Sequence, residues 1–228
     1  MDLTFLFDVD NTLLDNDRAK EMLAERLRAI LGTTGSERFW ALYEAVRADI
    51  GMVDVPLTIA RYEAERRVVR PALADLVMTF PFEDYLLPGA LAALAHARQM
   101  GRVVILSDGD PIFQTSKIWR AGLTAAAGGN VVVVPHKEER LRETTAAFPA
   151  DHYVLIEDKP AMLRAVRARL GDRVSTVFVR QGKYAAGSDE FAPDAVLGRI
   201  ADFCAFAAAD FPLNQPAGAA GAIHPADA

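Results

Sequence analysis

Five short apolar runs constrain the fold of this 228-residue chain, because each has the length and composition of a buried strand. They cover residues 5–7, 102–107, 130–134, 153–156 and 174–179. Helical patterns separate most of them, and near-continuous apolar strands that alternate with helices are typical of parallel sheets covered on both faces. We therefore predict an α/β fold with a doubly wound parallel sheet. A short extended piece and a last helix are predicted over 195–206.

A long helical block separates the first predicted strand from the second. Apolar residues repeat at helical spacing over 23–31 and 39–50, with a break at 32–35, and further helices are predicted over 56–70 and 73–77. A block of this length is too long for a simple crossover between two strands. It is instead typical of an inserted helical domain.

The domain organisation follows from these two patterns. Beyond residue 210 the chain is rich in Pro, Gly and Ala and has few large apolar residues, which favours an irregular or disordered tail. We predict a catalytic core of residues 1–16 and 86–210, a smaller all-helical domain of residues 17–85, and a tail of residues 211–228.

Polar residues follow the predicted strands at the points where the strands end. These residues are Asp8 and Asp10, Ser107 and Asp108, Lys137, and Glu157 with Asp158. Right-handed crossovers bring the carboxyl ends of parallel strands to one edge of the sheet, where open α/β sheets bind ligands. A lone D-x-D pair could merely cap the next turn, but its recurrence with other polar strand ends favours a functional site.

Composition excludes several classes of protein. The net charge of −6 and the absence of a dense Lys/Arg run argue against a nucleic-acid partner. No apolar run reaches the ~18 residues of a membrane span, and the N-terminus lacks a secretion signal. The single cysteine, Cys204, is predicted to be a small buried residue in a reducing setting. We expect a cytoplasmic protein that is a monomer or homodimer.

The polar strand ends resemble the four motifs of the haloacid dehalogenase-like superfamily, whose members are mostly phosphatases. The D-x-D-x-T motif corresponds to residues 8–12, the second motif to Ser107, the third to Lys137, and the acidic fourth motif to residues 157–158. Order and spacing agree over roughly residues 1–205. The helical insert is similar to the cap domain of this family.

The resemblance implies a Mg²⁺-dependent phosphomonoester hydrolase for a small phosphorylated metabolite, such as a sugar phosphate or a nucleotide. Asp8 would attack phosphorus to form an aspartyl-phosphate, and Asp10 would act as general acid and base. Asp8, the backbone carbonyl of Asp10, and Asp158 would hold the metal. Ser107, Asp108 and Lys137 would contact the substrate, and Lys137 would also neutralise charge during the reaction.

Some assignments stay open. The fourth motif lacks the further acid that commonly follows it, so Glu157 could contact metal-bound water or orient another ligand. Lys117 and Lys159 compete with Lys137 for the role of the catalytic cation. Lys117 is predicted to lie at the surface or the edge of the core, and Gln114 with it is interpreted as structural.

Three other functions are compatible with the pattern. A 2-haloacid dehalogenase of the same superfamily would use an aspartate nucleophile without Mg²⁺ and would lack the second aspartate of the first motif, so Asp10 argues against it. A phosphomutase would keep Asp10. A catalytically silent module could use the same acids to hold a metal structurally.

Overall fold

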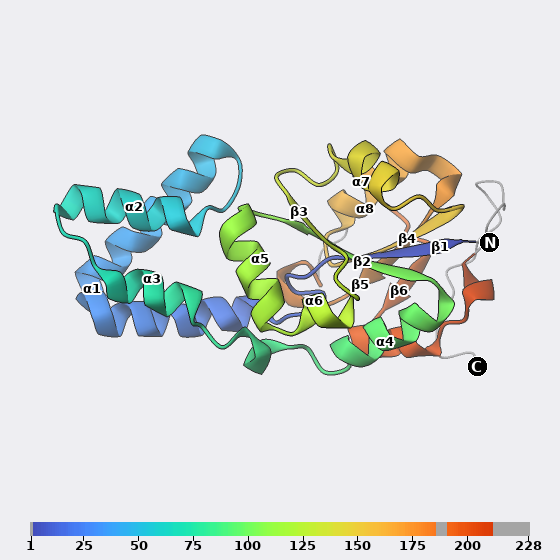
Figure 1. Ribbon diagram of the computed structural model, residues 1–228, viewed down its shortest axis with the longest axis horizontal. Coiled ribbons are helices and arrows are strands. Elements are labelled where there is room, and N and C mark those ends of the chain that lie inside the picture. Colours follow the sequence, from blue (N-terminus) through green and yellow to red (C-terminus); the bar gives the residue numbers. More distant parts are fainter. Residues whose placement is uncertain (1, 186–190, 212–228) are drawn as a thin grey trace.

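The computed structural model describes residues 2–185 and 191–211, so the predicted tail lies outside the described residues except for Phe211. An α/β body surrounds a six-stranded sheet, and a helical region lies beside it (Figure 1). Within the described part of the chain, no helix combines the length and apolar character needed to cross a membrane.

The sheet is parallel throughout, with the strand order β3-β2-β1-β4-β5-β6. Its strands are β1 (Leu3–Phe7), β2 (Arg102–Asp108), β3 (Val131–Val134), β4 (His152–Glu157), β5 (Val174–Val179) and β6 (Ala195–Leu197). The predicted doubly wound sheet is thus confirmed, and the short extended piece is its sixth strand.

Strand β1 shows why the apolar runs fold as they do. All five of its residues are buried, and β2 and β4 pair with it on either side. Side chains alternate across a strand, so Phe5 and Phe7 join one apolar core whereas Leu6 joins the core on the opposite face. Each such side chain stabilises the fold by about 1.5–3 kcal/mol through burial.

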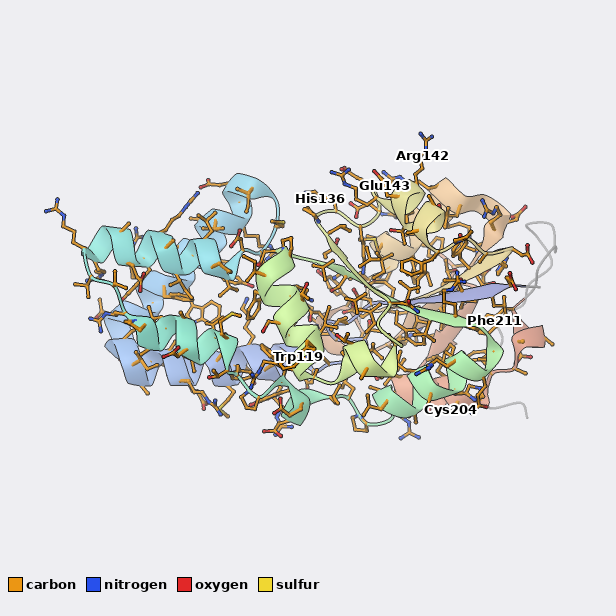
Figure 2. All side chains as sticks on the ribbon, in the orientation of Figure 1. Trp119, His136, Arg142, Glu143, Cys204 and Phe211 are labelled. Atoms are coloured by element: carbon orange, nitrogen blue, oxygen red, sulfur yellow. The ribbon has the colours of Figure 1, made fainter. Side chains whose placement is uncertain are left out.

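Helices connect the strands of the body. They are α4 (Ala90–Met100), α5 (Pro111–Arg120), α6 (Leu123–Ala126), α7 (Leu141–Ala147) and α8 (Pro160–Leu170), with the short 3₁₀ segments η1 (Phe82–Tyr85), η2 (Gly171–Arg173), η3 (Gly182–Tyr184), η4 (Ile200–Ala205) and η5 (Ala208–Asp210). The predicted last helix is the 3₁₀ segment η4. It buries Ile200 and Phe203, one 3₁₀ turn apart, and leaves Cys204 exposed, so the prediction of a buried cysteine is wrong (Figure 2).

The helical region contains α1 (Asn16–Ile50), α2 (Val55–Arg66) and α3 (Pro71–Met78). The break predicted in this region is confirmed at Gly32, where φ is 70° and ψ is 174°. Beyond Gly32 the helix changes direction, as Figure 1 shows. The second half of α1 therefore returns along the first, and Lys20 meets Glu44 at 3.9 Å.

The helical region packs against the edge of the sheet where the strands end. Helices α2 and α3 both contact α5, and α1 contacts η3. A Cβ added to Gly51, at the end of α1, would come within 3.2 Å of His136 Nε2 in the loop after β3. The polar strand ends are therefore covered by helices from the block that the sequence places between β1 and β2.

Candidate active site

The chain turns immediately after β1. The backbone N–H of Asp8 still donates to Ile156 O at 3.0 Å, and this extends the pairing with β4. The backbone N–H groups of the next turn then converge on Val9 O, including that of Thr12 at 3.2 Å. The Thr12 hydroxyl donates to Asp8 Oδ2 at 3.3 Å. Asp8 is consequently buried and fixed at the end of the strand.

Asn11 shapes the second half of this turn. Its φ of 62° lies in the left-handed region that asparagine tolerates better than most residues. Its side-chain oxygen accepts the backbone N–H groups of Asn16 and Asp17, at 3.1 Å and 3.2 Å, at the start of α1. Asn11 thus binds the first N–H groups of α1, whose N-cap is Asp15, and Asp10 is free for other contacts.

Lys137 lies at the centre of a buried charge cluster. Its ammonium forms ion pairs with Asp8 and with Glu157, the latter at 2.6 Å, and it has no exposed surface. Asp108 fixes the loop that carries it, because Asp108 Oδ1 accepts the Lys137 backbone N–H at 2.8 Å. Helix α7 begins only at Leu141, since hydrogen-bonded turns from His136 and Lys137 occupy the chain before it.

The cluster keeps the Asp8 carboxyl charged. Burial alone would raise the pKa of Asp8, but the charges of Lys137 and Lys159 hold that pKa below its usual value. Burial alone would likewise lower the pKa of Lys137, but the negative charges of Asp8 and Glu157 have the larger effect and raise that pKa. Burial and the nearby Asp8 charge raise the pKa of Glu157. The site thus presents an ionised Asp8 beside a protonated lysine.

Three buried carboxyl groups form a candidate metal site. Asp8, Glu157 and Asp158 each offer an oxygen within 4.8 Å of the others. Neither oxygen of Asp158 accepts a hydrogen bond from the described residues, and burial together with the charges of Asp8 and Glu157 raises the pKa of Asp158 to about 9. A hard, oxygen-only donor set of three carboxyl groups, one of them without a hydrogen-bond donor, fits Mg²⁺.

The predicted metal ligands overlap with this cluster in part. The structure brings together Asp8 and Asp158, as predicted for the metal, and adds the Glu157 carboxylate, whose role the sequence left open. The side chain of Asp10 lies elsewhere. The contribution of its backbone carbonyl stays a prediction.

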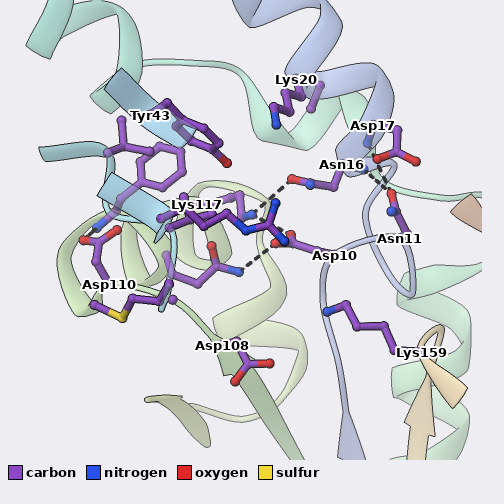
Figure 3. Close-up of a pocket in the computed structure, with 18 of the residues that line it drawn as sticks. Asp10, Asn11, Asn16, Asp17, Lys20, Tyr43, Asp108, Asp110, Lys117 and Lys159 are labelled. Carbon is purple, nitrogen blue, oxygen red and sulfur yellow. Dashed lines mark hydrogen bonds and ion pairs between the residues drawn. The ribbon is translucent and has the colours of Figure 1, made fainter. Parts of the chain in front are cut away.

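Asp10 belongs to a second polar group, which involves helix α5 (Figure 3). Lys117 Nζ contacts Asp10 Oδ1 at 2.5 Å and Asn16 Oδ1 at 3.3 Å. Gln114 Nε2 donates to Ser107 Oγ at 2.8 Å and to Asp10 Oδ2 at 3.4 Å. Lys117 is only 3% exposed, so the prediction of a surface or core-edge lysine is wrong.

The sequence pattern of α5 contains a signal for this arrangement. Its buried residues are Phe113, Gln114, Lys117 and Ile118, which repeat at helical spacing. Two polar residues on the apolar face of a helix need buried partners, because an unpaired polar group inside a protein is costly. Here the partners are the predicted site residues Asp10 and Ser107.

Comparison with known proteins identifies the family. The sequence model of the haloacid dehalogenase-like hydrolases matches residues 3–180. The chain belongs to this family. A structure from Burkholderia xenovorans LB400, described as a haloacid dehalogenase-like hydrolase, is 37% identical, and the match covers 90% of this chain and 99% of that one with a TM-score of 0.84. The predicted family and fold are therefore confirmed.

More distant structures share the fold of this haloacid dehalogenase-like hydrolase. One is a Bacillus subtilis HAD hydrolase bound to magnesium, at 15% identity, with 87% of this chain and 95% of that one covered and a TM-score of 0.59. Another is the L-2-haloacid dehalogenase of Xanthobacter autotrophicus with chloropropionic acid covalently bound, at 17% identity, 90% and 97% coverage, and a TM-score of 0.59. Curated proteins give no significant match.

A cavity of about 400 Å³ in the hydrolase opens over the polar strand ends. Residues of the body, including Asp10, Asp108, Lys117 and Lys159, line it together with residues of α1. A volume of this size accommodates a small molecule. Asp10 is the more accessible of the two motif aspartates, since its side chain is 27% exposed and that of Asp8 is 2% exposed.

Proposed function

We propose that this hydrolase is a Mg²⁺-dependent phosphomonoester hydrolase that acts on a small phosphorylated metabolite through an aspartyl-phosphate at Asp8. The observation that carries the proposal is that one strand end places two carboxyl groups, those of Asp8 and Asp10, in different surroundings. Asp8 is ionised among buried lysines and acids, and Asp10 reaches the cavity beside it.

The chain's own residues account for the two steps. In the first, an Asp8 carboxylate oxygen bonds to phosphorus while the bond from phosphorus to the ester oxygen breaks, and Asp10 gives its proton to that oxygen. In the second, Asp10 takes a proton from the water that attacks the aspartyl-phosphate. Inorganic phosphate leaves and Asp8 is restored.

The remaining site residues support these steps. Ser107 and Asp108 would contact the phosphoryl group, and Lys137 would balance charge on it and on Asp8. A Mg²⁺ ion held by Asp8 and Asp158 would offset the repulsion between the nucleophile and the phosphoryl oxygens. Glu157 would hold Lys137 in place, as their 2.6 Å ion pair suggests.

Asp10 favours ester hydrolysis over dehalogenation. An alkoxide needs a proton as its bond to phosphorus breaks, whereas a departing halide does not. Asp10 lines the cavity and Lys117 holds its carboxyl group there, which supports a role in proton transfer to the ester oxygen, a step that departure of a halide does not need.

The experiment measures phosphate release from an alkyl phosphate and from p-nitrophenyl phosphate, with Mg²⁺ and with EDTA, beside halide release from 2-chloropropionate. Asp8→Asn should reduce turnover to background. Asp10→Asn should cost about 10²–10⁴-fold with the alkyl ester and less in the first step with the aryl ester, whose phenolate leaves unaided. Asp172→Asn, on the exposed segment η2, is the matched control.

Two results would contradict the proposal. One is halide release without Mg²⁺ and no phosphate release from any ester. The other is an Asp8→Asn variant that keeps more than about a tenth of the wild-type kcat, which corresponds to a barrier increase below ~1.4 kcal/mol.

A further inference from the structure

On the α1 side of the cavity, two aromatic rings hold the side chain of Lys20. Lys20 Nζ lies 5.1 Å from the ring centroid of Trp40 and 4.5 Å from that of Tyr43. Aromatic faces attract ammonium groups, so the two rings keep this flexible side chain in one place. The turn of α1 at Gly32 is what brings Lys20 against the two rings. All three side chains line the cavity.

Three cations and two acids lie close together at this wall: Lys20, Arg47 and Lys183, with Glu44 and Asp17. Arg47 and Lys183 also line the cavity, and the positive charge of each lowers the pKa of Lys20. Glu44 lies 3.9 Å from Lys20 and 3.6 Å from Arg47, so two cations share one half-exposed carboxylate. Burial lowers the pKa of Lys20, and the charges of Arg47 and Lys183 add to this effect while Glu44 opposes it.

The aromatic residues add hydrogen-bond donors. Trp40 Nε1 is buried and has no hydrogen-bond partner among the described residues. Burial raises the pKa of the Tyr43 hydroxyl, which therefore keeps its proton. The Lys20 ammonium donates hydrogen bonds and accepts none, and the protonated Tyr43 hydroxyl can donate one, so this wall of the cavity suits an acceptor that carries negative charge.

This wall is separate from the groups assigned to the transferred phosphoryl group. Ser107 and Lys137 are at the strand ends, whereas Lys20 and Tyr43 project from α1 above Asp10 (Figure 3). Asp10 is also close enough to Tyr43 for its charge to raise the Tyr43 pKa, with burial as the larger cause. Asp10 and Asp108, at the strand ends, line the same 400 Å³ cavity as Lys20 and Tyr43, and a cavity of this volume accommodates a ligand of metabolite size.

We propose that Lys20, Arg47 and Lys183 form an anion subsite that binds a second acidic group, a carboxylate or a phosphate, on the alcohol part of the phosphate ester. The inference rests on the proposed function where it names a phosphate ester as the substrate. The binding of an acidic group by these three cations does not depend on that function. The preferred substrates are thus esters with an acidic group at each end.

The kinetic test compares matched esters. For the carboxylate, 2-phosphoglycerate is compared with glycerol 2-phosphate; for the phosphate, 1,3-propanediol bisphosphate is compared with its monophosphate. We expect wild-type kcat/KM to favour one of the doubly acidic esters by about 10-fold or more, since a hydrogen bond to a charged group is among the strong ones. Lys20→Met should bring that ratio close to 1, and Lys20→Arg should restore much of it. Arg28→Met, on the exposed side of α1, should keep the wild-type ratio.

A binding test does not depend on turnover. The chain has two tryptophans, so in a Trp119→Phe background Trp40 alone reports fluorescence. Glycerate or inorganic phosphate should change its emission saturably, glycerol should not, and Lys20→Met should remove the response.

The outcomes separate the two proposals. If wild type hydrolyses no ester but Trp40 still responds to an anion through Lys20, the proposed function fails and the subsite stands. The subsite is overturned if Lys20→Met keeps the wild-type preference, if wild type shows no preference for either doubly acidic ester, or if Trp40 responds to neither anion.

Discussion

Lys137→Met tests what holds the buried charge cluster together. The substitution keeps the length of the side chain but removes the ammonium that forms ion pairs with Asp8 and Glu157. Breaking a buried ion pair on one side costs about 3–5 kcal/mol, because the partner charge stays buried without compensation. Each kcal/mol lowers Tm by about 2–4 °C in a chain of this size, so we expect a fall of roughly 6–20 °C.

A double-mutant cycle shows whether the loss arises from the carboxylates. In Lys137→Met/Glu157→Gln one of the uncompensated charges is gone, so the free energy of unfolding should recover in part. The assay is urea unfolding followed by circular dichroism and tryptophan fluorescence. The control is Arg140→Met, which breaks an exposed pair with Glu143 and should leave stability unchanged. A loss below ~1 kcal/mol for Lys137→Met, or no recovery in the double variant, would refute the reasoning.

Two further predictions concern the metal and a histidine. Mg²⁺ at a concentration 100-fold above its Kd should stabilise the wild type by about 2.7 kcal/mol and so raise its Tm. Asp158→Asn should lose most of this Tm shift, and an equal shift in both proteins would exclude Asp158 as a ligand. Burial lowers the pKa of His152, which contacts Ser175 at 2.9 Å, so its neutral form contributes stability above pH ~6.5 that is lost as pH falls through the folded-state pKa. His152→Asn should therefore make the free energy of unfolding fall less steeply between pH 7 and 5, and an unchanged slope would contradict this assignment.

The strand ends could be predicted from the sequence because sheet topology alone brings them together. Asp8, Ser107, Lys137 and Glu157 each follow an apolar run, and parallel strands place such residues at one edge whatever the details of packing. Their contacts were less accessible to prediction. That Glu157 pairs with Lys137 depends on side-chain geometry in the turn that begins at His136, where φ is 52°.

Lys117 and Lys20 show why the rest could not be predicted. The mid-helix position of Lys117 predicts a place at the surface or the edge of the core, although its helix buries the face that carries it. The contact of Lys20 with Trp40 and Tyr43 depends on the change of direction at Gly32. A sequence pattern locates such a break but does not give its angle, so tertiary contacts between the two halves of α1 need coordinates.

The central position of β1 has a consequence for synthesis of the chain. This strand precedes both of its partners in the chain, and Phe7 pairs with Ile105 on one side and with Ile156 on the other. The ladder with β2 can form only after the helical region and β2 have been translated, and the ladder with β4 only after β4 has followed. During that interval an apolar segment with two unpaired edges is exposed to solvent and to neighbouring nascent chains. A ribosome that stalls before β2 therefore releases a fragment whose first strand has no partner.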